Sequence, residues 1–165
     1  MSNDEWIEAF WQDARVHANL NRLRAYLGPN IAETVPPPAW SFGADEETAD
    51  QLLDLVLDGT KTATASARRD YVGEELPSPG NLSIVTDGSG RPRVLIVTTS
   101  VRIVAFAEVD ADHARKEGEG DLSLDHWRTV HRAFFAETAE LTGQSAEVTD
   151  DLEVVLEEFK VVWQP

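Results

Sequence analysis

Ammonium, guanidinium and hydroxyl groups crowd into one short stretch of the sequence, DGTKTATASARRD, which occupies residues 58–70. Its polar side chains include those of Lys61, Thr62, Thr64, Ser66, Arg68 and Arg69. Lysine and arginine bind anions, and a hydroxyl group becomes a nucleophile when a nearby base takes its proton. The stretch is therefore either a binding and catalytic patch or the solvated edge of a strand, and the elements around it must decide between the two.

The net charge argues against a broad nucleic-acid-binding surface. The chain carries 30 acidic residues against 14 lysines and arginines, a formal net charge of −16, and such a surface repels polyanions. Residues 60–102 depart from this balance, with six basic and four acidic residues. This segment is either a local fluctuation or a basic patch that would admit an anion at one place on a repelling surface.

The composition is that of a folded domain. The chain has 165 residues, of which 42% are hydrophobic and 27% charged, enough to bury a sizeable core. No apolar run approaches the roughly 18 residues of a membrane span, and the acidic start MSNDEWIEAF does not resemble a secretory signal. The absence of cysteine excludes disulfides and thiolate metal sites. We therefore expect a soluble, cytoplasmic protein without a membrane segment.

The first 39 residues are predicted to be an appendage to the core. Apolar residues at three- and four-residue steps predict a helix over residues 4–27, which Gly28-Pro29 would end. Three prolines at positions 36–38 fix an extended linker, so the core should begin near Trp40. The first half of this helix carries three aromatic residues, Trp6, Phe10 and Trp11. This aromatic face could dock on a protein partner, pack on the core or form a homodimer.

The core reads as a mixture of helices and strands. A helix is predicted over residues 45–58, capped by Gly59, and is followed by a strand in KTATASA. The β-branched runs LSIV and RVLIVTTSVRIVAF flank the turn DGSG and predict a hairpin. Helices follow in DADHARKEGEGD and SLDHWRTVHRAFFAETAEL, and DLEVVLEEFKVVW closes the chain as a strand. This order lacks βαβ alternation and predicts an α+β domain around a small antiparallel sheet or barrel.

One motif links the reactive stretch to a known family. Gly59, Lys61 and Thr64 form a Gly-x-Lys-x-x-Thr pattern at the junction of a predicted helix and strand, with WSFG before it and PGNLSIV and DADHARKEGEGDLSLDHWR after it. In these features residues 40–163 resemble the ASCH family, a branch of the PUA-like superfold, and most of all its longer bacterial members. The expected division is an N-terminal helix and Pro-rich linker over 1–39 and an ASCH domain over 40–165.

The resemblance implies a fold, an activity and a set of residues. The fold would be a small PUA-like antiparallel β-barrel with flanking helices and a cleft. Some members of the family resemble RNA-binding modules, and others are hydrolases that deacetylate N4-acetylcytidine or cleave RNA. The amidohydrolase residues fall on Lys61, Thr64 and Glu117 of the block HARKE. We therefore expect a hydrolase acting on RNA or an acylated nucleoside; the alternative is a non-catalytic module that binds RNA or a nucleotide.

These three residue types suffice for acyl transfer. Burial can lower the pKa of a lysine towards neutrality, so that its amine activates a threonine hydroxyl. A carboxylate from Glu117, or from Glu119 beside it, could protonate the leaving amine, and backbone amides near the strand start could hold the oxyanion. Residues 61 and 64 point to opposite faces of a regular strand. Shared chemistry therefore predicts irregular backbone at residues 60–63.

Further residues are expected to contact the ligand. Trp40 and Tyr71 would wall the cleft, since an aromatic ring beside guanidinium groups suits a nucleobase. The hydroxyls of Thr62 and Ser66 would extend a row with Thr64, and Arg68 and Arg69 would form an anion-facing rim. The short amidohydrolase members carry an arginine two residues after the threonine, where this chain has Ser66, so substrate identity does not follow from the resemblance.

A metal site could be drawn from His113, Glu117, His126 and His131. Zinc sites in proteins favour cysteine ligands or closely spaced histidine motifs, and the sequence offers neither. We therefore expect no metal and no cofactor, and the predicted ligand is RNA or a small nucleoside or nucleotide.

Overall fold

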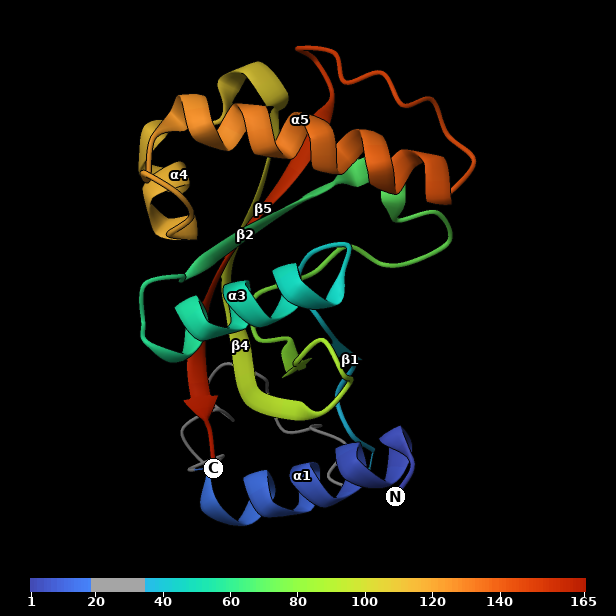
Figure 1. Cartoon of the computed structure of the whole chain (residues 1–165), viewed down its shortest axis with the longest axis vertical. Coiled ribbons are helices and arrows are strands. Elements are labelled where there is room, and N and C mark those ends of the chain that lie inside the picture. The colour runs from blue at the N-terminus through green and yellow to red at the C-terminus, as the bar shows by residue number, and fades with distance from the viewer. Residues whose placement is uncertain (19–34) are drawn as a thin grey trace.

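The computed structural model describes residues 1–18 and 35–165 as an α+β domain, the class predicted from the sequence (Figure 1). The helices are α1 (Asn3–His17), α3 (Glu46–Leu57), α4 (Ala111–Glu117) and α5 (Leu124–Leu141), with 3₁₀ turns at Arg68–Asp70 and Phe106–Glu108. The strands are β1 (Ala39–Trp40), β2 (Ala63–Ala67), β3 (Leu82–Thr86), β4 (Pro92–Ala105) and β5 (Glu153–Trp163). None of the helices in these two ranges is both long enough and apolar enough to cross a bilayer.

The strands form one five-stranded sheet in the order β1-β3-β4-β5-β2. All neighbours are antiparallel except β1 and β3, which are parallel. The long strands β4 and β5 make the spine of the molecule, with α4 and α5 at one end and α1 at the other (Figure 1). The edge strands β1 and β2 do not pair with each other in the described part of the chain, so the predicted barrel is open.

The predicted hairpin is present. Strands β3 and β4 pair directly around the DGSG turn, where the amide of Asp87 donates to the carbonyl of Arg91 at 2.9 Å. The Asp87 carboxylate also accepts hydrogen bonds from the amides of Ser89 and Arg91. A side chain that mimics a backbone acceptor in this way stabilises a tight turn.

Helix α1 differs from its prediction in two ways. It ends at His17, because Ala18 adopts an extended conformation with ψ 135°, so the predicted helix over residues 4–27 is too long. Residues 19–27 and the predicted stop at Gly28-Pro29 lie outside the described residues. Phe10 and Trp11 are buried against Ile84 and Leu95 of the sheet. Much of the aromatic face is thus covered by the chain's own core, and the homodimer stays a prediction.

Helix α3 delivers the reactive stretch to the sheet. The Asp45 side chain caps its start by accepting from the Thr48 amide at 2.8 Å, and Gly59, at φ +86°, turns the chain away after its end. Strand β2 begins at Ala63, so residues 60–62 are irregular, whereas Ala63, also predicted to be irregular, is already strand. This irregular backbone allows Lys61 and Thr64 to reach one pocket although they are three residues apart.

Candidate functional site

A large pocket lies between α3 and α5, over strand β2, with a volume of about 1070 Å³. Six of the nine residues predicted for the site line it: Trp40, Lys61, Thr64, Ser66, Tyr71 and Glu117. They come from β1, the α3–β2 connection, β2, the loop after it and the end of α4. The pocket therefore gathers segments that are far apart in the sequence.

The Lys61 ammonium is buried in this pocket, with 2% of the residue exposed. Its Nζ lies 3.9 Å from Oε2 of Glu117 and 3.7 Å from Oε1 of Glu119. It also donates to the Glu117 backbone carbonyl at 3.4 Å and lies 5.3 Å from the centre of the Phe42 ring. A buried charge needs such partners, because its desolvation is otherwise costly. The sequence left open which glutamate faces the cleft; both line the pocket.

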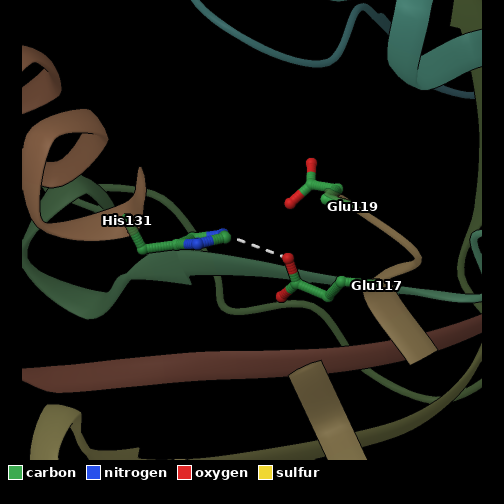
Figure 2. Close-up of side chains that lie close together, drawn as sticks. All are labelled: Glu117, Glu119 and His131. Atoms are coloured by element: carbon green, nitrogen blue, oxygen red, sulfur yellow. Dashed lines mark ion pairs between the residues drawn. The ribbon is translucent and has the colours of Figure 1, made fainter. Parts of the chain in front are cut away.

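Two histidines hold the carboxylate of Glu117. His113, one turn earlier on α4, places Nε2 2.6 Å from Oε1, and His131 of α5 places Nε2 3.0 Å from Oε2. Figure 2 shows Glu117, Glu119 and His131 converging from α4, the following loop and α5. The other ring nitrogen of His131 lies 2.9 Å from the Trp127 carbonyl. Both nitrogens of His131 therefore face acceptors, an arrangement that suits an imidazolium.

This network shifts two pKa values in opposite directions. Burial alone would raise the pKa of Glu117, but the His113 hydrogen bond, the His131 charge and Lys61 together hold it well below its usual range. Burial likewise opposes the charged form of His131, yet its contacts with Glu117 and the charge of Glu119 raise its pKa. Glu117 is thus an anion clamped between cations, which suits a residue that positions its neighbours.

Gly118 determines the backbone conformation between Glu117 and Glu119. It closes α4 in the left-handed conformation at φ +73°, which L-residues with a Cβ rarely adopt. A Cβ at this position would lie 2.7 Å from the Thr60 carbonyl oxygen. Next to this close approach, the Thr62 amide donates to the Lys116 carbonyl at 2.8 Å. The end of α4 is thus locked against the segment that carries Lys61.

Strand β2 presents its hydroxyls to the pocket by simple alternation. Ala63, Ala65 and Ala67 are buried, and Thr64 and Ser66 between them are half-buried. Both line the pocket, and the Ser66 hydroxyl hydrogen-bonds that of Tyr71 at 2.7 Å. The period of two places alternate residues on one face, so the predicted row of hydroxyls exists for these two residues.

A further pocket residue, Glu157, was missed by sequence reasoning. It lies on β5 directly opposite Thr64 in the antiparallel register and lines the pocket. Burial raises its pKa to about 7, and a hydrogen bond with Thr98 only partly opposes this shift. The signal in the sequence is a pair of adjacent glutamates within a strand rich in apolar residues, VVLEEFKVV. That pattern alone does not say which glutamate turns inward.

The structure does not bring the predicted residues Thr62, Arg68 and Arg69 into the pocket with the other six, and their assignment to a hydroxyl row and an anion-facing rim stays a prediction. Thr62 precedes the strand, is exposed, and its hydroxyl donates to the Lys116 carbonyl at 3.4 Å. Arg68 pairs with Glu153 at 2.9 Å on the surface. The Arg69 guanidinium donates to two backbone carbonyls, of Glu147 and Phe135, at 3.0 and 3.2 Å.

The basic segment 60–102 likewise does not gather into a patch at the pocket. Arg91 stacks on Trp6, while Arg93 and Arg102 pair with carboxylates of the surface. Lys61 is the only lysine or arginine among the described residues that line the pocket. Its acidic lining residues are Asp45, Asp70, Glu74, Glu75, Glu117, Glu119, Glu137 and Glu157. The pocket is therefore a poor receptor for a phosphate.

The expected oxyanion donors are also engaged elsewhere. The amide of Gly59 donates to the Val56 carbonyl, that of Lys61 to Leu55 and that of Thr62 to Lys116, while the amide of Thr60 is bonded to the Asp58 carboxylate at 2.8 Å. Backbone groups already paired cannot stabilise a developing charge without losing a bond. The Lys61 ammonium lines the pocket and is a cation that could take this task.

The donors of Glu117, Glu119 and His131 lie within 4.8 Å of one another, a spacing that could accommodate a metal ion. Lys61 argues against it, since its ammonium is already 3.7 and 3.9 Å from the two carboxylates. Two unit positive charges about 4 Å apart repel by roughly 4 kcal/mol at an effective dielectric constant near 20. The arrangement thus suits a lysine-centred cluster, and the expectation of no metal stays a prediction.

Comparison with known proteins places this geometry in a family. A sequence model described as "ASCH domain" matches residues 38–163. A crystal structure of a protein from Enterococcus faecalis V583 superimposes with a TM-score of 0.78 and 30% identity, covering 96% of this chain and 88% of that one. A crystal structure of an ASCH domain from Lactobacillus crispatus JV V101 has a TM-score of 0.73 and 36% identity, covering 88% and 92%.

Curated relatives match over a shorter region. Lipoprotein LpqB of Rhodococcus opacus (strain B4) and that of Rhodococcus jostii (strain RHA1) are each 36% identical to this chain over 66 residues. The alignment covers 40% of this chain and 11% of each lipoprotein. The chain therefore spans about a tenth of the length of these relatives.

Proposed function

The chain belongs to the ASCH domain family, and from that premise we propose that it is an amidohydrolase acting on a small acylated nucleoside, of which N4-acetylcytidine is the model. The family is generally related to RNA binding, which makes a nucleoside a natural ligand. One observation carries the proposal: a buried ammonium, Lys61, shares a pocket with the Thr64 hydroxyl and has two carboxylates within 4 Å. These are the groups that acyl transfer from an amide requires.

In the proposed first step, the Thr64 Oγ1 attacks the amide carbonyl carbon of the substrate. Its proton passes to Lys61 as Lys61 releases one to Glu119, whose side chain keeps 17% of its surface exposed. Lys61 therefore remains an ammonium beside the developing oxyanion, which it stabilises. Glu117, closed off by two histidines, acts by positioning Lys61 and His131.

The tetrahedral intermediate then collapses as the carbon–nitrogen bond breaks and Glu119 returns its proton to the leaving nitrogen. The acyl group remains as an ester on Thr64. Water next attacks the ester carbonyl and gives its proton to Glu119, and the carbon–oxygen bond breaks. Thr64 regains a proton through Lys61, and the free carboxylic acid leaves. Both steps conserve protons and restore the starting groups.

The second candidate is a non-catalytic module that binds RNA or a nucleotide in the same pocket. The general relation of the family to RNA favours it. The acidic lining and the single lysine of the described pocket count against it, because phosphates bind where cations gather. A ribonuclease activity meets the same objection. The small, uncharged substrate is therefore preferred.

Incubation with candidate substrates tests the proposal. N4-acetylcytidine, other acylated nucleosides and single-stranded RNA are each offered to the wild type and to Lys61→Ala, and products are read by mass spectrometry. The wild type should release cytidine and acetate from N4-acetylcytidine, and Lys61→Ala should lose at least about a hundredfold in rate, since it lacks the group that moves the proton.

Lys160→Ala is the matched control, because Lys160 is an exposed lysine of β5 that does not line the pocket. It should keep the wild-type rate. Turnover by Lys61→Ala at the wild-type rate would overturn the role of Lys61. Absence of any product from every acylated nucleoside, together with RNA binding that weakens with added salt, would favour the second candidate.

A further inference from the structure

Glu157 is an acidic residue of the pocket that the proposed reaction does not use. It projects from β5 between two neighbouring strands, opposite Thr64 of β2 and Val101 of β4. Its side chain lines the same pocket as Lys61 and Thr64. No lysine, arginine or histidine within the described ranges comes within 4.0 Å of its carboxylate, unlike that of Glu158 beside it, which lies 2.6 Å from Lys116.

The surroundings of Glu157 favour the neutral form of its side chain. Burial raises its pKa to about 7, with a hydrogen bond to Thr98 as the opposing contact. Tyr71 lines the same pocket, and its pKa is raised by burial and, to a smaller extent, by the negative charge of Glu157. A carboxyl group kept neutral near physiological pH has both an O–H donor and a C=O acceptor, adjacent and in one plane.

We propose that Glu157 is the residue that recognises the base, by donating one hydrogen bond and accepting another as a neutral carboxylic acid. The matching ligand edge carries an acceptor next to an N–H donor, such as N3 and the exocyclic amine of cytosine. An ionised carboxylate could only accept and would face the lone pair of N3. The inference rests on the proposed function, because it assumes that the pocket takes a nucleoside.

The position of Glu157 suits this role. Glu157 faces Thr64 across the β2–β5 strand pair. A base bound by Glu157 would therefore lie close to the Thr64 hydroxyl, the proposed nucleophile. Neighbouring strands are about 4.8 Å apart, so one bound nucleoside could contact both Glu157 and Thr64. Recognition and reaction would thus use one face of the sheet.

Calorimetric titration with cytidine tests the assignment at about pH 6 and about pH 8.5. Wild-type affinity should fall roughly tenfold or more at the higher pH, where the acid form of Glu157 becomes scarce. Glu157→Gln should bind like the wild type at about pH 6 and change less than about threefold with pH, because an amide also offers one donor beside one acceptor. Glu157→Leu should bind at least about tenfold more weakly at both values.

Other titratable groups line the same pocket and must be separated from Glu157. They include Lys61, Asp70, Tyr71, Glu74, Glu117, Glu119 and His131. All of them remain in Glu157→Gln, so a pH dependence that persists in this variant would belong to them and would overturn the proposal. Glu158→Gln, which alters the glutamate paired with Lys116, is the matched control and should keep the wild-type pH dependence.

The outcomes are distinct from those of the hydrolase test, since cytidine is a product and is not turned over. Binding that Glu157→Gln weakens tenfold at about pH 6 would show that an anion is required and would overturn the proposal. Failure of the wild type to bind cytidine at either pH would overturn it as well. A protein that binds cytidine with the expected pH dependence but does not hydrolyse N4-acetylcytidine would support this assignment and contradict the amidohydrolase.

Discussion

Two ionisable residues on neighbouring parts of one pocket wall have opposite surroundings. Lys61 lies within 4 Å of two carboxylates, whereas Glu157 has no cation within 4.0 Å among the described residues and its pKa is raised to about 7 by burial. Environments that separate ionisable groups in this way are typical of sites where one group moves protons and another stays neutral. At the scale of single residues, the charge states of the lining side chains therefore define the site as much as the shape of the pocket does.

The raised pKa of Glu157 has a consequence for stability. Below about pH 4.5 the side chain is mostly protonated in both folded and unfolded chains, so it does not change the free energy of unfolding. As pH rises towards 7 the folded chain retains a proton that the unfolded chain releases, so the free energy of unfolding falls. Glu157→Gln should match the wild type near pH 4.5 and be more stable by roughly 1–3 kcal/mol near pH 8. Urea denaturation at the two pH values measures this difference.

Comparison within one pair of proteins removes the contributions of other groups, such as Asp70, whose pKa burial also raises. Glu158→Gln again serves as the control, because this substitution removes an ion pair with Lys116 and does not remove a buried, unpaired charge. It should not gain stability near pH 8. Equal stability of Glu157→Gln and the wild type at both pH values would mean that Glu157 ionises as freely as an exposed carboxylate.

Some of these residues were accessible from the sequence and others were not. The spacing of Gly59, Lys61 and Thr64 placed a lysine and a threonine at a helix–strand junction, and the structure puts both in the pocket. The position of Arg69 away from the pocket was not predictable, because its partners are the carbonyls of Glu147 and Phe135, more than 60 residues away in the chain. Local sequence does not reveal where a long side chain finds its acceptor, since only the tertiary fold brings the two together.

At the scale of elements, the junction of α4 with the α3–β2 connection controls the geometry of the cluster. Gly118→Ala forces a Cβ into the left-handed region and to within 2.7 Å of the Thr60 carbonyl oxygen. The left-handed conformation costs an L-residue about 1–2 kcal/mol, and the contact adds to that cost. We expect a clear loss in the free energy of unfolding by urea, and slower turnover because Glu117 and Glu119 shift relative to Lys61.

Gly143→Ala is a matched control for this change. Gly143 has φ +71° but nothing within 4 Å of an added Cβ, so it carries the conformational cost without the clash. Gly118→Ala should therefore be the less stable variant and should alone slow turnover. Equal effects of the two substitutions would indicate that the contact with Thr60 relaxes at little cost and does not determine the positions of Glu117 and Glu119 relative to Lys61.

The same scale shows how far periodicity predicts the fold. Helix α5 and strands β4 and β5 were predictable, because long segments with one apolar face or dense β-branching have few alternatives. Strand β1 has two residues, too few for any period to register. The end of α1 at His17 was also missed, because the apolar pattern continues past it. The open edge between β1 and β2 depends on packing that no local pattern encodes.

At the scale of the whole molecule, the net charge of the chain and the charge of the pocket lining are both negative. The chain carries a formal charge of −16, and eight acidic side chains against one lysine line the described pocket. A cleft lined by one sign of charge focuses the field of the molecule into it. An uncharged nucleoside enters without penalty, whereas each phosphate brings negative charge towards carboxylates. If the proposed function holds, the surface and the pocket would both disfavour nucleic acid and nucleotides.

Competition between cytidine and cytidine 5′-monophosphate tests this selection. At about 20 mM salt the nucleoside should bind roughly tenfold or more tightly than the nucleotide, since repulsion between the phosphate and the acidic wall is then weakly screened. At about 500 mM salt the Debye length falls to roughly 4 Å, and the preference should shrink by severalfold while cytidine affinity changes little. A nucleotide that binds more tightly, and loses affinity as salt is added, would instead show that the pocket receives a phosphate at Lys61 despite its acidic lining.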